Sequence, residues 1–183
     1  TSKPDGYTLL VSISAMLTAA EVSRAWNVKL VTDFAPITLV AKDKMLLIVS
    51  PTSGLSSISQ MIAEGKAHPN KLTYGTPGIG TPHHIARVQI LHATYKSSLP
   101  FVNDLIGGQI DIGLQGFGTV LPHVQSGQVE ALAMTSERRY PKMPQVLTLD
   151  ESGIKGVEVD QWYAFHAPKA TPASVVALLN TEI

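Results

Sequence analysis

The residues best suited to hold a ligand lie in the stretch Tyr74–His84, whose sequence is YGTPGIGTPHH. It follows a short β-prone run and precedes a helical pattern. Gly75, Gly78 and Gly80 permit backbone angles that side chains forbid, and they let another molecule approach the main-chain amides. Thr81 can cap the helix that follows. Because free N–H groups and the positive end of a helix dipole point the same way at such a turn, the stretch predicts an anion site.

Two plainer interpretations of the same stretch remain open. Glycine and proline also punctuate ordinary strand-to-helix turns. Gly78 and Gly80 resemble the start of the dinucleotide fingerprint G-x-G-x-x-G, but His83 stands where the third glycine belongs. An acidic residue should follow about 20 residues later, and Asp104 lies instead inside a separate helical pattern. The sequence therefore disfavours a nicotinamide cofactor, and we predict no cofactor of any kind.

Nearby histidines raise the question of a metal or catalytic centre. His83 and His84 are adjacent, and adjacent helical side chains point about 100° apart. Together with His92 they would still need further histidine or carboxylate ligands to hold zinc. Asp104 and Asp111 lack metal-ligand spacing, and neither G-x-S-x-G nor H-E-x-x-H occurs. We therefore predict no metal site and no catalytic residue, and we expect that the protein is not an enzyme.

Composition narrows the possible function classes further. Of 183 residues, 44% are apolar and 15% are charged, which is typical of a globular domain. The net charge is zero and no basic block occurs, so a nucleic-acid partner is disfavoured. Because cysteine is absent, disulfides and thiolate chemistry are excluded. No apolar run approaches the ~20 residues that span a bilayer.

Periodicity predicts strands that alternate with helices. Runs rich in β-branched and aromatic residues predict strands, and apolar residues at helical spacing predict helices. Ser57 and Gln60 fit a capping box, and Thr171 is expected to cap the last helix. The predicted strands cover residues 7–13, 34–40, 45–49, 71–74, 90–94, 110–114, 129–134 and 161–167, and helices lie between them and after residue 171.

This alternation is typical of an α/β fold with largely parallel sheets. Ligands of such folds lie beyond the carboxyl ends of the strands. Three of these ends are rich in small and polar residues, which predicts one shared cleft; they are Ser12–Ser14, Gly75–Thr81 and Gln115–Thr119.

Six segments occur in the order in which one protein family has them: Pro4–Leu10, Asp33–Ile37, Leu72–His84, Tyr95–Lys96, Asp104–Gln109 and Ala167–Pro172. The chain closely resembles the Bug/TctC proteins, the extracytoplasmic solute receptors of tripartite tricarboxylate transporters. The resemblance implies a type II periplasmic binding protein, with two lobes of mainly parallel sheet joined by hinge strands. Lobe 1 would comprise residues 1–49 and 161–183, and lobe 2 residues 50–160.

The implied function is that of a periplasmic solute-binding protein, a monomer that captures a small organic acid or amino acid for a membrane permease. The alternative is a small-molecule hydrolase or transferase that uses the same inter-lobe cleft, for which a nucleophile–base pair would be needed. Family members begin upstream of Thr1 and end beyond Ile183, so we expect a piece of a longer protein whose signal peptide is not in this chain. A loop is hypothesised to be missing between Gln89 and Ile90.

The ligand-binding residues predicted by these arguments are Ser12, Ser14, Thr76, Gly78, Gly80, Thr81, His84, Tyr95 and Gln115. Ser14 has a helix cap as its alternative role, and His84 has core packing. Gln115 stands where many family members have aspartate. Because a neutral amide donates hydrogen bonds to a carboxylate, whereas aspartate suits an ammonium group, Gln115 favours an acid without a free amine.

Overall fold

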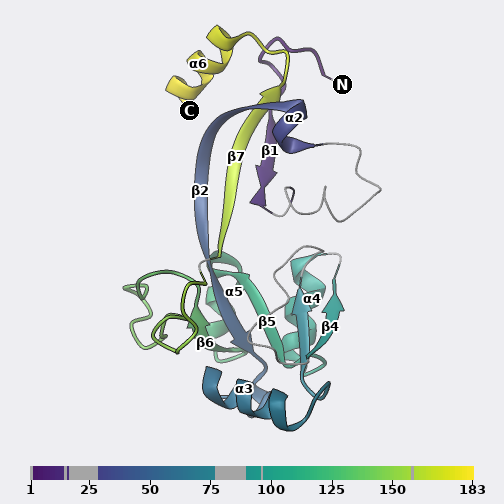
Figure 1. Ribbon diagram of the computed structural model, residues 1–183, viewed down its shortest axis with the longest axis vertical. Helices are drawn as coiled ribbons and strands as arrows, with labels where there is room; N and C mark the ends of the chain where they lie inside the picture. The colour runs from purple at the N-terminus through teal and green to yellow at the C-terminus, as the bar shows by residue number, and fades with distance from the viewer. Residues whose placement is uncertain (1, 15, 17–28, 77–89, 96, 158) are drawn as a thin grey trace. The chain divides into compact units, whose positions relative to one another are not determined.

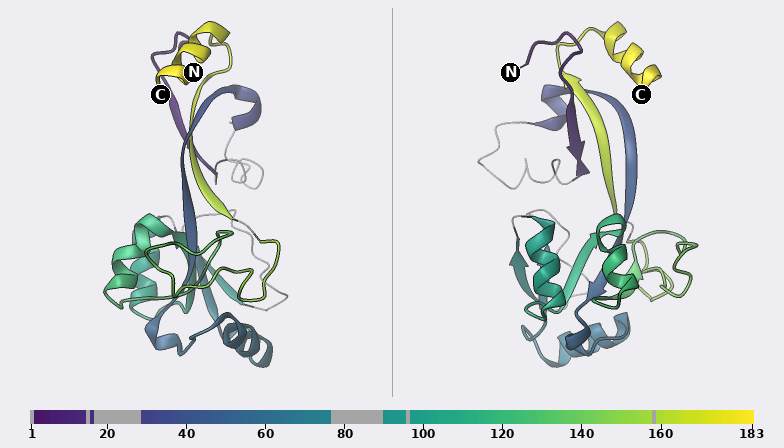
Figure 2. Two further views of the ribbon diagram at one scale, coloured as in Figure 1. Left: turned by 90° about the vertical axis from the view of Figure 1, so that its left-hand side faces the viewer. Right: turned by 180° about the vertical axis from the view of Figure 1, so that it is seen from behind.

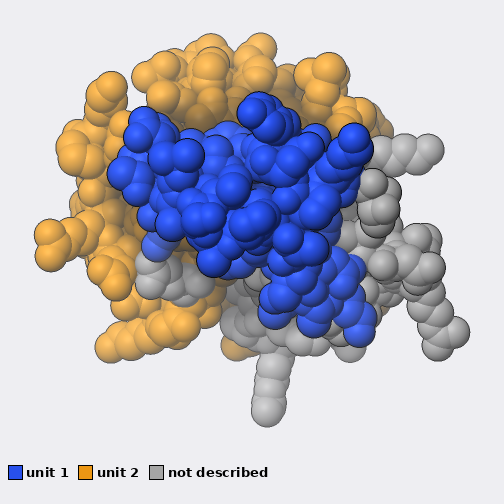
Figure 3. All heavy atoms as spheres, turned by 90° about the horizontal axis from the view of Figure 1, so that it is seen from above, with its two compact units in different colours: residues 1–42, 161–183 blue, residues 43–160 orange. Residues whose placement is uncertain are grey.

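The computed structural model describes residues 2–14, 16, 29–76, 90–95, 97–157 and 159–183. The chain divides into two compact units, which Figure 3 distinguishes by colour. Unit 1 comprises Thr1–Lys42 and Gln161–Ile183, and unit 2 comprises Asp43–Asp160. The predicted lobes have the same boundary after residue 160. Their other boundary was predicted after residue 49, whereas the units divide after residue 42. Whether these units act as ligand-binding lobes stays a prediction.

The sheet of unit 2 contains five strands in the order β6-β2-β5-β3-β4 (Figure 1). Its members are β2 (Phe34–Val49), β3 (Thr73–Thr76), β4 (Leu91–Thr94), β5 (Ile112–Gly116) and β6 (Glu130–Met134). Strand β3 runs parallel to β4 and β5, whereas β2 is antiparallel to β5 and β6. The predicted α/β class is confirmed. The sheet is mixed rather than mainly parallel, because β2 enters unit 2 in the direction opposite to that of its neighbours.

Two hydrophobic cores cover the two faces of this sheet. Since successive strand residues point to opposite faces, Met45, Leu47 and Val49 of β2 pack in one core, and Leu46 and Ile48 pack in the other. Helix α3 (Ile58–Ala67) covers the first face, and helices α4 (Ser98–Ile106) and α5 (Phe117–Gln125) cover the second. The continuous apolar run at residues 45–49 is thus buried on both faces, as expected for such a strand.

Two strand glycines allow Phe101 of α4 to lie against the sheet. A Cβ atom at Gly113 would fall 2.3 Å from Cζ of Phe101, and one at Gly75 would fall 2.9 Å from the same ring. Neither glycine has a positive φ. The prediction that Gly75 serves unusual backbone angles is therefore wrong, because this glycine makes room for two buried side chains, those of Ile110 and Phe101.

Unit 1 is built on three adjacent strands in the order β1-β7-β2 (Figure 2). Strand β1 (Leu10–Ile13) pairs antiparallel with β7 (Asp160–Pro168), which places Ser12 opposite Ala164. The unit also contains the short helix α2 (Leu30–Asp33) and the terminal helix α6 (Ala173–Glu182). Both large cores lie in unit 2, and several large apolar side chains of unit 1 are exposed, among them Tyr7, Val11, Val31, Leu39 and Val40.

Some predictions about single strands and helix caps are confirmed, and others are wrong. The strands expected at residues 34–40 and 45–49 form one strand, β2, and Pro51–Ser53 forms a short 3-10 turn after it. Ser57 caps α3 by accepting a hydrogen bond from the Gln60 N–H (3.1 Å), but the Gln60 side chain accepts from Ser56, so the capping box is shifted by one residue. Thr171 does not cap α6, because Pro172 holds that position.

Within the described ranges, none of the helices combines the length and the apolarity needed to cross a membrane.

Candidate functional site

Five of the nine predicted ligand-binding residues fall within the described part of the chain: Ser12, Ser14, Thr76, Tyr95 and Gln115. The other four, Gly78, Gly80, Thr81 and His84, lie outside the described residues, as does the hypothesised gap after Gln89. The anion site predicted for residues 76–81 therefore stays a prediction.

Thr76 and Gln115 lie at one edge of the unit 2 sheet. Strands β3 and β5 are parallel neighbours, with Tyr74 opposite Ile112 and Gly75 opposite Gly113. Their carboxyl ends therefore meet, as ligand sites of α/β folds require. Side chains alternate along each strand, so Thr76 shares the face of Tyr74, while Gln115 shares the opposite face with Gly113. The two residues frame this edge from its two faces.

The hydroxyl of Thr76 is engaged by a histidine of the neighbouring strand. Thr76 is fully buried, and its Oγ1 lies 2.9 Å from Nε2 of His92. The imidazole also lies against the Tyr74 ring, with centroids 5.8 Å apart. His92 thus braces the end of β3. Among the described residues, no group of three or more histidine, cysteine or acidic side chains is arranged to hold a metal.

Gln115 carries the least satisfied polar group of this edge. Its side chain is almost fully buried, and its Oε1 accepts a hydrogen bond from the backbone N–H of Gly116 (2.9 Å). Its Nε2 has no acceptor among the described residues. A buried donor without an acceptor costs about 1–3 kcal/mol, so an acceptor supplied by a ligand would recover stability at this point.

The backbone amides that follow Gln115 are already bonded to protein oxygens. The Asp43 carboxylate accepts hydrogen bonds from the N–H groups of Gly118 and Phe117, at the start of α5. Burial raises the pKa of Asp43 and the negative charge of Asp160 adds to this, while those two hydrogen bonds oppose the shift. These amides are therefore not available to a ligand. What remains there is the side-chain donor of Gln115.

Tyr95 has a well-defined partner inside unit 2. Its hydroxyl donates a hydrogen bond to Asp104 (2.7 Å), and its ring meets Phe101 edge-on, with centroids 5.9 Å apart. Burial and the hydrogen bond to Asp104 raise the pKa of Tyr95 to about 12. The hydroxyl therefore stays protonated and fixes the segment before α4. A direct role for Tyr95 in ligand binding stays a prediction.

In unit 1 the predicted residue Ser12 meets a histidine that sequence reasoning missed. Ser12 Oγ donates to the carbonyl oxygen of Ala164 (3.2 Å) and lies 3.0 Å from Nδ1 of His166. Burial lowers the pKa of His166, while a hydrogen bond to the backbone of Ala164 opposes this shift. Ser12 is fully buried, so this hydroxyl–imidazole pair cannot present a nucleophile to a substrate. The partly buried Ser14 follows it at the start of a helical segment.

Comparison with known proteins places the chain in a family. A family model described as "Tripartite tricarboxylate transporter family receptor" (TctC) matches residues 1–183. This chain belongs to the TctC family. The resemblance read from its six ordered segments is thereby confirmed.

Two curated TctC relatives show how much of a related protein the chain covers. Protein BugT of Bordetella pertussis is 32% identical over 192 residues, which are 100% of this chain and 59% of BugT. A UPF0065 protein from the tcbD–tcbE intergenic region of Pseudomonas sp. strain P51 is 32% identical over 188 residues, which are 98% of this chain and 56% of that protein. The chain thus spans little more than half the length of these relatives.

Solved structures agree with this placement. The periplasmic binding protein BugD has a TM-score of 0.83 at 32% identity, over 97% of this chain and 62% of BugD. The R. palustris protein Rpa4515, solved with adipate, has a TM-score of 0.89 at 28% identity, over 98% of this chain and 63% of Rpa4515. These neighbours confirm the predicted fold as that of TctC-type periplasmic binding proteins.

Proposed function

We propose that this TctC chain belongs to a periplasmic solute receptor that captures a small organic carboxylate and delivers it, as a monomer, to a membrane permease. The observation that carries the proposal is the buried amide of Gln115, whose Nε2 has no acceptor among the described residues. It lies at the carboxyl end of β5, where ligands of α/β folds bind. A carboxylate oxygen is the acceptor that best matches this donor, because it carries charge and several lone pairs.

Both side-chain and main-chain N–H and O–H groups would donate hydrogen bonds to the carboxylate. A hydrogen bond to a charged group contributes about 1.5–3 kcal/mol. Gln115 together with the amides and hydroxyls predicted at Thr76–Thr81 would supply four or five such bonds. After ordering costs this corresponds to micromolar affinity, about −8 kcal/mol. Such affinity suits a receptor, which must both scavenge its ligand and release it.

The chemical class of ligand follows from the two side chains at the β5–α5 turn. The Gln115 amide favours a carboxylate. The half-buried Asp43 carboxylate, which accepts hydrogen bonds from the next two backbone N–H groups after Gly116, would instead favour an ammonium group. Asp43 already accepts two backbone N–H groups, while the Gln115 donor is unused. We therefore place acids without a free amine ahead of amino acids. The adipate held by Rpa4515 is the first probe, because that protein is a structural neighbour.

Isothermal titration calorimetry with adipate, citrate and glutamate tests the proposal. We expect micromolar binding of a non-amine acid, which Gln115→Leu weakens about 10- to 100-fold through loss of a charged hydrogen bond. Gln125→Leu, at an exposed position in α5, is the matched control and should leave affinity unchanged. Gln115→Leu removes the unsatisfied Nε2 donor but also takes away the acceptor of the Gly116 N–H. Because these two effects oppose each other, the unfolding temperature of the free protein should change little.

Mass analysis of the same mixtures tests the enzymatic alternative. Turnover of any acid in the panel would contradict the receptor function. Equal loss of affinity in Gln115→Leu and Gln125→Leu would contradict the role given to the buried amide.

A further inference from the structure

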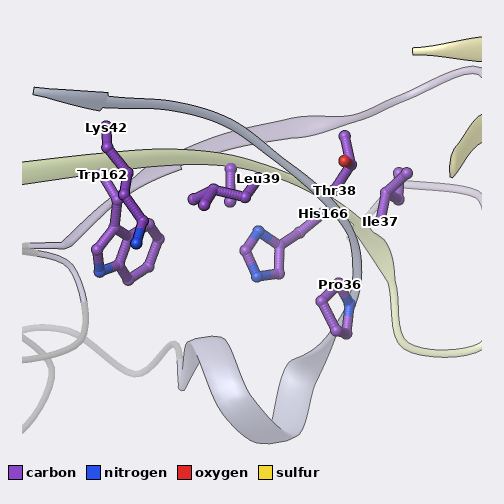
Figure 4. A pocket seen from close by; sticks show the side chains of 8 residues that line it. Pro36, Ile37, Thr38, Leu39, Lys42, Trp162 and His166 are labelled. Atoms are coloured by element: carbon purple, nitrogen blue, oxygen red, sulfur yellow. The ribbon is translucent and has the colours of Figure 1, made fainter.

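Unit 1 contains a pocket of its own, and its described lining includes none of the predicted ligand-binding residues. Its volume is about 430 Å³, and it is lined by residues 36–39 and 42 of β2 and by Trp162, Ala164 and His166 of β7 (Figure 4). We call this the β2–β7 pocket. Its volume falls within the range of about 300–1,000 Å³ that is typical of small-molecule sites.

The walls of the β2–β7 pocket are mainly apolar. Trp162 and His166 share one face of β7, because strand residues two apart point the same way. These two rings line the pocket from β7, and the aliphatic side chains of Leu39 and Pro36 line it from β2, as Figure 4 shows. Leu39 is 51% exposed, although it is a large apolar residue on a strand. An apolar guest would cover it and gain the free energy of removing that surface from water.

One wall of the pocket is fixed in advance by hydrogen bonds. The His166 ring is held through Nδ1 by Ser12, whose own hydroxyl donates to Ala164. Ser12 and Ala164 are buried, so this arrangement does not depend on a guest. Binding to a preformed wall loses less side-chain entropy than binding to a mobile one.

The charge of the pocket selects the guest. Lys42 is a lining residue, and no acidic side chain belongs to the described lining. Among the described ion pairs, none involves Lys42. A guest with an apolar body and one negative charge would satisfy both the walls and this ammonium group.

We propose that the β2–β7 pocket binds a small carboxylic acid with an aromatic or aliphatic body, its carboxylate directed at Lys42 and its body against Trp162 and Leu39. This is a second site, whose described lining comes from unit 1, and it differs in class from the predicted polar site at the unit 2 sheet edge.

Benzoate is the probe, and the fluorescence of Trp162 is the readout. The chain contains two tryptophans, so the measurement uses Trp26→Phe, in which Trp162 is the only one. We expect a saturable change in emission with a dissociation constant of about 0.1–1 mM. Lys42→Met should weaken benzoate about three- to fivefold, the worth of a partly exposed charge pair. Neutral benzamide should bind as weakly to the parent as benzoate binds to this variant.

Lys169→Met is the matched control, because it removes the same charge from an exposed position of unit 1 that does not line the pocket. It should leave benzoate affinity unchanged, and circular dichroism should report the same fold for both variants. Gln115→Leu should also retain benzoate binding, which separates this proposal from the receptor function.

Three results would overturn the proposal. The first is the absence of a saturable change in Trp162 emission. The second is benzoate binding that Lys42→Met leaves intact or that Lys169→Met weakens equally. The third is Trp162 emission that depends on protein concentration and not on benzoate, which would mean that a second copy of the chain covers this face.

Discussion

Gly113→Ala should destabilise unit 2, because the strand offers no room for a side chain there. The added Cβ would lie 2.3 Å from Cζ and 2.8 Å from Cε2 of Phe101. Phe101 is fully buried in the second core, so its ring cannot swing into solvent to make room. Overpacking of this kind costs about 1–3 kcal/mol. For a chain of this size it should lower the unfolding temperature by about 2–4 °C per kcal/mol.

The assay is urea unfolding followed by circular dichroism, with Gly118→Ala as the matched control. Gly118 lies in helix α5, and among the described residues a Cβ there would meet only Asp43 Oδ2, at 3.9 Å. That change should be neutral or stabilising by up to about 1 kcal/mol, since alanine favours a helix. In a double-mutant cycle, Phe101→Leu should relieve part of the Gly113→Ala cost. Equal stability of Gly113→Ala and Gly118→Ala, or full additivity with Phe101→Leu, would refute the packing argument.

Two further predictions concern titrating groups of unit 2. The fold raises the pKa of Asp43 above its ordinary value of 3.8, so the folded protein binds this proton more tightly than the unfolded chain does. The contribution of this proton to the unfolding free energy is complete below pH 3.8, and it is lost as the pH rises through the raised pKa of the folded protein. The unfolding free energy of Asp43→Asn should therefore increase relative to the parent across that window in urea titrations, and a pH-independent difference would contradict the shift. Tyr95→Phe should cost about 1 kcal/mol through the lost bond to Asp104. It should also remove a tyrosine that ionises near pH 12 in ultraviolet titration, and a titration curve identical to the parent's would show that another tyrosine is responsible.

Local patterns predicted the elements that depend on short-range physics. The uninterrupted apolar run of residues 45–49 predicted a strand buried on both faces, and both cores confirm it. Ser57 predicted the start of α3, because a cap and its helix are neighbours in sequence. Thr171 failed in the same role, since Pro172 tolerates the first position of a helix or the position before it, and sequence alone does not decide between them.

Contacts between distant segments could not be predicted in this way. Ser12 and His166 are 154 residues apart, and only the register of β1 on β7 brings them together. Asp43 reaches the start of α5 because β2 pairs with β5, which no local pattern reveals. Gly75 was correctly singled out as special but for the wrong reason, because it makes room for the side chains of Phe101 and Ile110, which come from later segments of the chain.

In the candidate site, too, the sequence predicted a residue, and only the structure shows its contacts. Gln115 was identified from its place at the end of a predicted strand and from the family resemblance, and the structure adds that its Nε2 is buried without an acceptor among the described residues. That detail depends on the packing around β5, since Oε1 is taken by Gly116 and the following amides are taken by Asp43.

The most direct measurement of carboxylate capture observes the Gln115 side chain itself. In nitrogen–proton correlation spectra, the side-chain NH₂ resonances of Gln115 are assigned by their loss in Gln115→Leu. Addition of adipate should move them saturably, with the same midpoint as the calorimetric titration, because the amide then donates to a charged acceptor. Resonances that stay in place while adipate binds, or an adipate titration without any binding, would contradict the function proposed for this edge of the sheet.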